Sequence, residues 1–195
     1  MFLVIQNMTH HIRTAFGNSS RTYGPNPPGA HPYMGVLQGN GAAGTSWTAV
    51  SLVIFAAMKS LGYGYSTQMA TTKTILCLLG FTFIDDANII HSGPSNTTPA
   101  GQILIKMQAV LDHWDRLLRA TGGALEKSKS YWYLLDYAYT QGCWILKLQS
   151  ANPGTISLYN DITNQKEPIE RLNPSESRKA LGIYSNPLGH MGAEK

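Results

Sequence analysis

The chain has 195 residues, of which 43% are hydrophobic and 13% are charged. This length suits one globular domain or a piece of a larger one, with enough apolar side chains for a core. Soluble domains average about 25% charged residues, so some of this surface is expected to meet a neighbour. The formal net charge of +4 favours anionic partners, although charge alone does not separate nucleic acid from an anionic membrane.

The same sequence excludes several classes of protein. Cys77 and Cys143 are the only cysteines, which argues against a disulfide framework, and the histidines lack the spacing of a zinc site. Met1–Ile5 is too short for the apolar part of a signal peptide, and no apolar run reaches the roughly 18 residues of a membrane-spanning helix. We therefore expect an intracellular protein, nuclear or cytoplasmic, without a membrane partner.

The N-terminal part predicts a hairpin, a loop and a helix. Turn-forming Gly17–Ser20 separates two short runs, His10–Ala15 and Arg21–Tyr23, which indicates a β-hairpin. The prolines and glycines of Pro25–Gly41 exclude regular structure and predict a stiff loop. Thr45–Leu61 follows as a helix with almost no charge, so we expect it to be buried nearly all round.

The middle of the chain predicts a second hairpin and a second helix. Thr74–Phe83 and Ala87–His91 are apolar enough to be central, buried strands. Pro99–Ala120 has apolar residues at helical spacing, and Gly122-Gly123 predicts the end of that helix.

The C-terminal part predicts further strands. Tyr131–Tyr139 and Trp144–Leu148 flank the turn-forming Thr140–Gly142, and Thr155–Tyr159 follows. The irregular mixture of helices and strands indicates an α+β fold, with an antiparallel sheet and packed helices. We expect one domain made of five successive segments, which are 8–33, 34–62, 74–91, 99–130 and 131–192.

Asp85 and Asp86 are the most informative residues, because two neighbouring carboxylates stand between the two apolar strands of the middle hairpin. At a tight bend their negative charges repel each other unless a cation neutralises them. Mg²⁺ prefers such oxygen ligands and is usually held by one or two carboxylates together with substrate phosphates. The alternative is a solvated acidic turn that carries no metal.

The acid pair also interrupts a basic half of the chain. No Asp or Glu precedes Asp85, whereas Arg13, Arg21, Lys59 and Lys73 give the first 84 residues a charge of +4. A polyanion could lie on such a surface. The alternative is that these well-separated cations only solvate the fold.

Four segments, in this order, resemble the palm subdomain of reverse transcriptases of the non-LTR retrotransposon type: Gln38-Gly39, Phe83–Asp86, Gly122-Gly123 followed by Lys129-Ser130, and Arg178–Ile183. The last is similar to the Leu-Gly element that ends the palm and helps to grip the primer. The resemblance spans roughly residues 8 to 192. It implies part of a right-hand polymerase palm that acts as an RNA-directed DNA polymerase, with an RNA template, a DNA primer and deoxynucleotides as partners.

The resemblance also implies a mechanism. The primer 3′-hydroxyl would attack the α-phosphate of a nucleotide, with two Mg²⁺ ions about 4 Å apart activating the attacking oxygen and stabilising the leaving pyrophosphate. Asp85 would be the principal metal ligand, and Asp86 a second ligand or an electrostatic support. Lys129 would be a general acid or charge partner for the pyrophosphate, unless it is only a surface lysine.

The remaining residues of the resemblance would bind substrate. Gln38 and Gly39 would meet the nucleotide or template, where close backbone approach requires glycine. Phe83 would be the buried aromatic that seats the hairpin, and Leu181 and Gly182 would touch the primer backbone. Each of these roles has an alternative. Gln38-Gly39 would be a plain turn, and Leu181-Gly182 would only mark the start of a strand.

The chain departs from the family pattern in two places. The Ser-Pro that usually follows Gln-Gly is replaced by Ala42–Gly44, and the upstream aspartate that bridges both metals has no counterpart before Asp85. Because ligand number sets Mg²⁺ affinity, the sequence predicts a fragment that is inactive without an upstream polymerase segment. Two other hypotheses are a non-catalytic nucleic-acid-binding remnant and a small metal-dependent hydrolase that uses Asp85 and Asp86.

Overall fold

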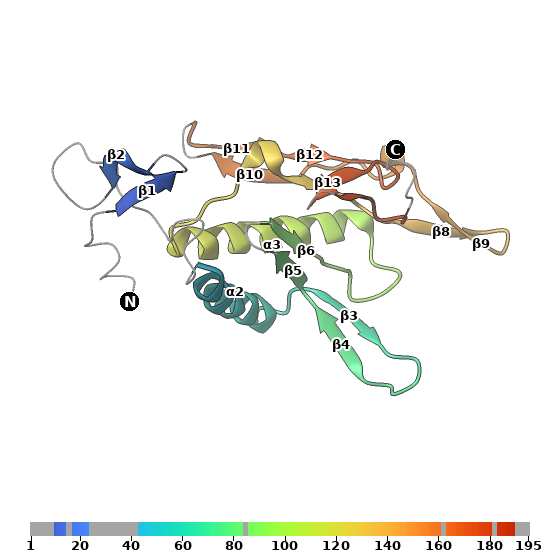
Figure 1. The fold of residues 1–195 in the computed structure, drawn as a ribbon. Helices are drawn as coiled ribbons and strands as arrows, with labels where there is room; N and C mark the ends of the chain where they lie inside the picture. The colour runs from blue at the N-terminus through green and yellow to red at the C-terminus, as the bar shows by residue number, and fades with distance from the viewer. Residues whose placement is uncertain are drawn as a thin grey trace. The chain divides into compact units, whose positions relative to one another are not determined.

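The computed structural model describes residues 10–14, 17–23, 43–83, 86–160, 163–180 and 183–189. The chain divides into two compact units, Met1–Ala49 and Val50–Lys195. In the described residues, two α-helices alternate irregularly with short strands, so the fold class is α+β, as the sequence predicts (Figure 1). Neither of these helices combines the length and the apolar character needed to cross a bilayer.

The first unit contains the predicted N-terminal hairpin. Strands β1 (His10–Thr14) and β2 (Gly17–Tyr23) are antiparallel and end with Thr14 opposite Gly17, with an irregularity between His11 and Arg13. The bend therefore comes before Gly17, and the polar Gly17–Ser20 segment, expected as the turn, begins strand β2 instead. The expected loop over Pro25–Gly41 lies outside the described residues.

Helix α2 (Ala43–Ser60) confirms the predicted helix but not its burial. Ser51, Ile54 and Met58 are buried, and their spacing places them on one side of the helix. Leu52 and Val53 are 64% and 69% exposed. The expectation of burial on nearly all sides is wrong, because an apolar helix is covered only where neighbours pack against it.

The predicted middle hairpin is in fact two hairpins. Strand β3 (Tyr65–Gln68) pairs with β4 (Ile75–Leu78), and β5 (Gly80–Phe83) pairs with β6 (Asp86–Ile89), both antiparallel. The expected strand Thr74–Phe83 is interrupted at Leu79, a buried residue that separates the two ladders.

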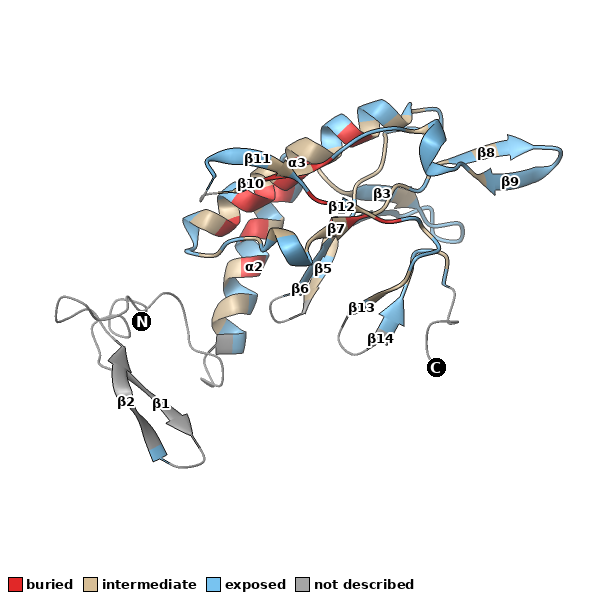
Figure 2. Cartoon of the chain, turned by 90° about the horizontal axis from the view of Figure 1, so that it is seen from above, coloured by how far each residue is buried: buried red, intermediate tan, exposed pale blue. Residues whose placement is uncertain are grey.

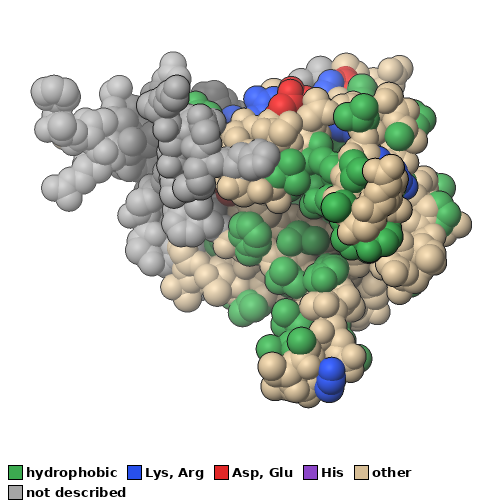
Figure 3. Space-filling view, turned by 90° about the vertical axis from the view of Figure 1, so that its right-hand side faces the viewer, with side chains coloured by type: hydrophobic (Ala, Val, Ile, Leu, Met, Phe, Trp, Pro, Cys, Tyr) green, Lys and Arg blue, Asp and Glu red, His purple; other side chains and the backbone are tan. Residues whose placement is uncertain are grey.

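The strands that were expected to be central are exposed. All of β4 is exposed, with Ile75 at 69%, and apolar side chains cover the surface that faces the viewer down to the projecting β3–β4 hairpin (Figure 3). Apolar composition indicates that a strand can be buried, but burial also requires a third strand or a helix against its face. In the described residues every sheet has only two strands.

Helix α3 (Ala100–Ala120) matches its prediction to within one residue. Its buried residues recur at helical spacing, as an amphipathic helix requires: Leu104, Val110, Leu111, Trp114, Asp115 and Leu118. The helix ends as the glycine pair predicts, since the Gly123 N–H donates to the Leu118 carbonyl at 3.0 Å and Gly122 has a φ of 87°.

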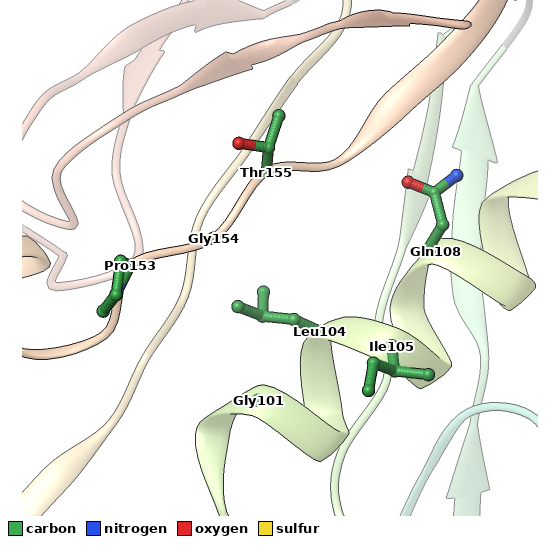
Figure 4. A pocket seen from close by; sticks show the side chains of 7 residues that line it. All are labelled: Gly101, Leu104, Ile105, Gln108, Pro153, Gly154 and Thr155. Atoms are coloured by element: carbon green, nitrogen blue, oxygen red, sulfur yellow. The ribbon is translucent and has the colours of Figure 1, made fainter.

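The core of the second unit lies between α3 and strands that follow it (Figure 2). Its buried residues come from far apart in the sequence: Leu104, Leu111, Trp132, Ile156, Leu158 and Ile169. Gly154 permits this packing, because a Cβ there would lie 2.4 Å from a methyl group of Leu104 (Figure 4). Gln108 fixes α3 to strand β10 by exchanging two hydrogen bonds with the Ser157 backbone, at 2.8 and 2.9 Å.

The C-terminal strands are shorter than predicted. The expected strand Tyr131–Tyr139 is split into β7 (Tyr131–Trp132) and β8 (Tyr137–Thr140), which pair with different partners; just before β8, the side chain of Asp136 accepts hydrogen bonds from Lys147 and Asn152. The remaining elements are β9 (Cys143–Leu146), β10 (Ser157–Asn160), β11 (Gln165–Pro168), β12 (Glu170–Arg171), β13 (Arg178–Ala180), β14 (Ile183–Ser185) and the short 3-10 helices η1 (Lys127–Lys129) and η2 (Gln149–Ala151).

These strands also pair two by two. The pairs β8–β9, β10–β11 and β13–β14 are antiparallel, whereas β7 and β12 are parallel. The β8–β9 hairpin is exposed along nearly all its length (Figure 2). The α+β class is thus confirmed, but the single antiparallel sheet is replaced, in the described part of the chain, by separate strand pairs.

Candidate functional site

The candidate site is the tip of the β5–β6 hairpin. Phe83 is paired with Asp86, so residues 84 and 85 are the only ones between the two strand ends. A hairpin bend therefore falls between Phe83 and Asp86, but Asp86, which the sequence places in the bend, belongs to strand β6 instead. Asp86 is exposed to solvent at the first position of β6. Asp85 lies outside the described residues.

Backbone packing at the other end of the hairpin depends on a glycine. A Cβ on Gly80 would lie 2.0 Å from the carbonyl oxygen of Asn88 on the partner strand. Ile90 continues the pairing by donating its N–H to the Leu79 carbonyl at 2.7 Å. Gly80 thus permits the close approach of strands that determines where Asp86 stands.

Asp86 lies within electrostatic range of Tyr131, which begins strand β7. Burial raises the pKa of the Tyr131 hydroxyl above its usual value, the charge of Arg178 opposes this change, and the carboxylate of Asp86 adds to it. The hydroxyl is therefore protonated at neutral pH and offers a hydrogen-bond donor. Charges from the start of β6 (Asp86) and the start of β13 (Arg178) therefore both act on Tyr131 of β7.

Arg178 connects the elements of this site. Its guanidinium carbon is 5.8 Å from the centre of the Tyr131 ring, and one of its nitrogens pairs with the carboxylate of Glu170. Tyr131 packs edge-on against Tyr133 at 5.7 Å, and Tyr133 donates its hydroxyl proton to the carbonyl of Glu176 at 3.0 Å. These contacts place a cation and two tyrosines around the β7–β13 side of the site.

The residues present fit a divalent cation in part. Asp86 is an exposed oxygen ligand of the kind that Mg²⁺ uses when substrate phosphates complete its coordination. Among the described residues, no group of three His, Cys, Asp or Glu side chains could hold a metal ion. A metal at this tip would thus depend on Asp85, on substrate and on ligands from elsewhere.

Lys129 is exposed at the end of η1, and none of the contacts found in the described residues joins its amine to Asp86. Its neighbour Lys127 has a structural partner, since its Nζ lies 2.6 Å from a carboxylate oxygen of Glu167. That hydrogen bond is the first cause that lowers the pKa of Glu167. The geometry therefore leaves Lys129, rather than Lys127, available for an anionic ligand.

The other predicted site residues are located only by the elements beside them. The backbone of Phe83 belongs to β5, and Ala180 pairs with Ile183 so that residues 181 and 182 are the only ones between the ends of β13 and β14. Gln38, Gly39, Leu181 and Gly182 lie outside the described residues.

Tyr131 was missed by reasoning from the sequence. It stands two residues after Lys129, but nothing local to it indicates a position near Asp86, because the two belong to different strand pairs. Arg178 lies in the segment Arg178–Ile183, whose Leu-Gly pair resembles the primer-gripping element. That resemblance was a sequence signal that could have identified Arg178 as a site residue.

No protein-family model matches the chain, and no curated protein or solved structure matches it either.

Proposed function

We propose that the chain is a palm fragment of a reverse transcriptase of the non-LTR retrotransposon type, which adds nucleotides to a primer 3′-hydroxyl when another segment completes its metal site. The observation that carries this proposal is the pairing of Phe83 with Asp86, which leaves residues 84 and 85 between the strand ends and places the exposed Asp86 directly after them, at the start of β6. Because its side chain is exposed, Asp86 would be able to bind a cation that is also held by a substrate phosphate.

A second observation supports the proposal. Residues 181 and 182, the Leu-Gly pair, fall in the chain between the paired ends of β13 and β14, just as residues 84 and 85 fall between those of β5 and β6. Arg178, on strand β13, and Asp86 both act electrostatically on Tyr131. This common neighbour supports the proposal that the two segments belong to one site.

The described residues suggest how such a site would work. Asp86 would supply one carboxylate oxygen for a cation that binds together with nucleotide phosphate. When bound, divalent cations would activate the 3′-hydroxyl and neutralise the departing pyrophosphate. Tyr131, which stays protonated at neutral pH, would donate a hydrogen bond to Asp86 or to a phosphate oxygen, and Lys129 would offer a mobile cation to the leaving group.

The second candidate function is a non-catalytic nucleic-acid-binding remnant. It is favoured by one observation, the absence of any acidic residue before Asp85, since the proposed chemistry needs a further carboxylate. The cations of that basic half and the exposed Lys129 would still attract a phosphate backbone.

Two measurements on the full chain separate these functions. The first is the broadening of amide NMR signals by Mn²⁺, which should be confined to the β5–β6 bend and lost in Asp85→Asn and Asp86→Asn. Asp112→Asn is the matched control, because Asp112 is a carboxylate on α3 that pairs with Lys166. Uniform broadening, or broadening that survives both site variants, would contradict the metal site.

The second measurement is primer extension on an RNA template with Mg²⁺. Incorporation that Asp85→Ala abolishes would support the palm, whether it is seen with the chain alone or after an upstream palm segment is added. Salt-sensitive binding to the primer–template duplex without metal binding or incorporation would favour the remnant. Hydrolysis of a small phosphate ester, without nucleotide incorporation and without binding to the duplex, would favour a metal-dependent hydrolase.

A further inference from the structure

A hollow of about 290 Å³ lies beside the first turns of α3, away from the acidic tip. Its apolar wall includes Pro94, Ile103 and Ile105. Its polar side chains include His91, Gln102 and Lys106, and none of the described residues that line it is a carboxylate. All the ionisable side chains around this hollow are therefore ones that carry or can gain positive charge.

His91 is held in one orientation on the wall of the hollow. The Gly64 N–H points at its Nδ1 at 3.4 Å, and the ring of Tyr63 meets the imidazole edge-on at 6.3 Å. Because Nδ1 accepts that N–H, the proton of the neutral ring resides on Nε2. His91, which lines the hollow, therefore has a neutral N–H group left to donate to a ligand.

Among the described residues, no ion pair joins Lys106, the cation beside His91, to a carboxylate. Burial is the first cause that lowers the pKa of His91, the hydrogen bond with the Gly64 backbone opposes this change, and the positive charge of Lys106 adds to the lowering. Tyr63 is the other ionisable group that packs on the ring, and its hydroxyl is engaged with Nδ1 of His113 at 3.1 Å. An anion between Lys106 and His91 would pair with the Lys106 ammonium and accept a hydrogen bond from the neutral imidazole.

We propose that this hollow binds a nucleotide, with a phosphate group between Lys106 and His91 and the organic part against Pro94, Ile103 and Ile105. The phosphate accepts hydrogen bonds from the Lys106 ammonium and from Nε2 of His91. A ligand pocket with mostly apolar walls and a few convergent polar groups is the usual form of a small-molecule site. Asp85 and Asp86 take no part in this site, so it does not depend on the proposed polymerase function.

The test uses the full chain at pH 7.5 and low ionic strength, with AMP as the probe. We expect AMP to bind, to shift the imidazole NMR signals of His91, and to lose about tenfold or more in affinity in Lys106→Gln. Lys106→Arg, which retains the charge, should retain binding. The matched control is Arg116→Gln, which removes a cation from an exposed position of the same helix outside the hollow and should leave the affinity within about twofold.

Further ligands separate the parts of the proposal. Adenosine should not bind measurably, and binding equal to that of AMP would overturn the role of the phosphate. Inorganic phosphate should bind more weakly than AMP, and equal affinity would overturn the role of the apolar wall. If only a single-stranded oligonucleotide shifted the His91 signals, the assignment to a mononucleotide would be wrong. Equal loss of affinity in Lys106→Gln and Arg116→Gln would show a non-specific charge effect and overturn the site.

Discussion

Substitution of Gly80 by alanine tests the geometry on which the proposed function rests. The added Cβ would lie 2.0 Å from the Asn88 carbonyl oxygen, whereas real Cβ atoms essentially never approach another atom to under 3.0 Å. The strands must therefore separate by about 1 Å at this point, because the obstacle is backbone and cannot rotate away as a side chain does.

The cost follows from what the separation disturbs. A shift of that size would weaken the Ile90 to Leu79 hydrogen bond and the neighbouring bonds of the ladder. Two backbone hydrogen bonds contribute about 1–3 kcal/mol together, and overpacking of a filled site costs a similar amount. We expect Gly80→Ala to lower the free energy of unfolding by about 2 kcal/mol and to abolish Mn²⁺ broadening at Asp86.

Urea denaturation and amide hydrogen exchange measure the two consequences. Exchange should accelerate in β5 and β6 while amides of α3 stay protected. Gly101→Ala is the matched control: nothing lies within 4 Å of its added Cβ, and alanine in a helix is favoured by up to about 1 kcal/mol. A Gly80→Ala chain as stable as Gly101→Ala, with unchanged signals from β6, would refute the described strand pairing.

Three other outcomes are expected. Gln108→Ala removes both hydrogen bonds to the β10 backbone and should lower the free energy of unfolding by about 2 kcal/mol in urea, while a change under about 0.5 kcal/mol would contradict this contact. Burial lowers the folded-state pKa of His91, so below pH 6.5 the unfolded chain binds more protons than the folded chain does. The free energy of unfolding should therefore fall as the pH drops below 6.5. Urea denaturation curves of His91→Asn, measured over the same pH range, should show a smaller fall. Lys127→Ala should raise the pKa of Glu167 toward its ordinary value, followed by carboxyl carbon NMR, whereas an equal rise in Lys129→Ala would count against the ion pair.

Local signals in the sequence were enough for some elements. The limits of α3 were predicted to within one residue, because apolar side chains recur at helical spacing and Gly122 supplies the left-handed residue that ends the helix. The strand pairing at the acidic tip was predicted because two polar residues between apolar runs favour a bend. Both features depend on residues close together in the chain.

Burial and pairing between distant segments were beyond the reach of such signals. Thr74–Phe83 has the composition of a buried strand, yet its first part is exposed, because no third strand among the described residues covers β4. The parallel pair of β7 with β12 joins two-residue strands; β7 lies within the predicted strand Tyr131–Tyr139, but nothing in its sequence indicates β12 as its partner. The position of Tyr131 near Asp86 depends on how the β7–β12 pair packs beside the β5–β6 pair. The sequence of either segment alone does not predict that packing.

The exposed hairpins and the incomplete metal site lead to the same physical requirement. Tyr137, Tyr139, Trp144 and Leu146 share one face of the β8–β9 hairpin, since Tyr137 is opposite Leu146 and Tyr139 is opposite Trp144. Tyr139 and Trp144 are more than 60% exposed, and a lone two-stranded sheet is only marginally stable in water. A segment that covered such faces would supply the neighbour implied by the low charge content. If the same segment brought a carboxylate to the acidic tip, it would also complete the ligand set that Asp85 and Asp86 leave short.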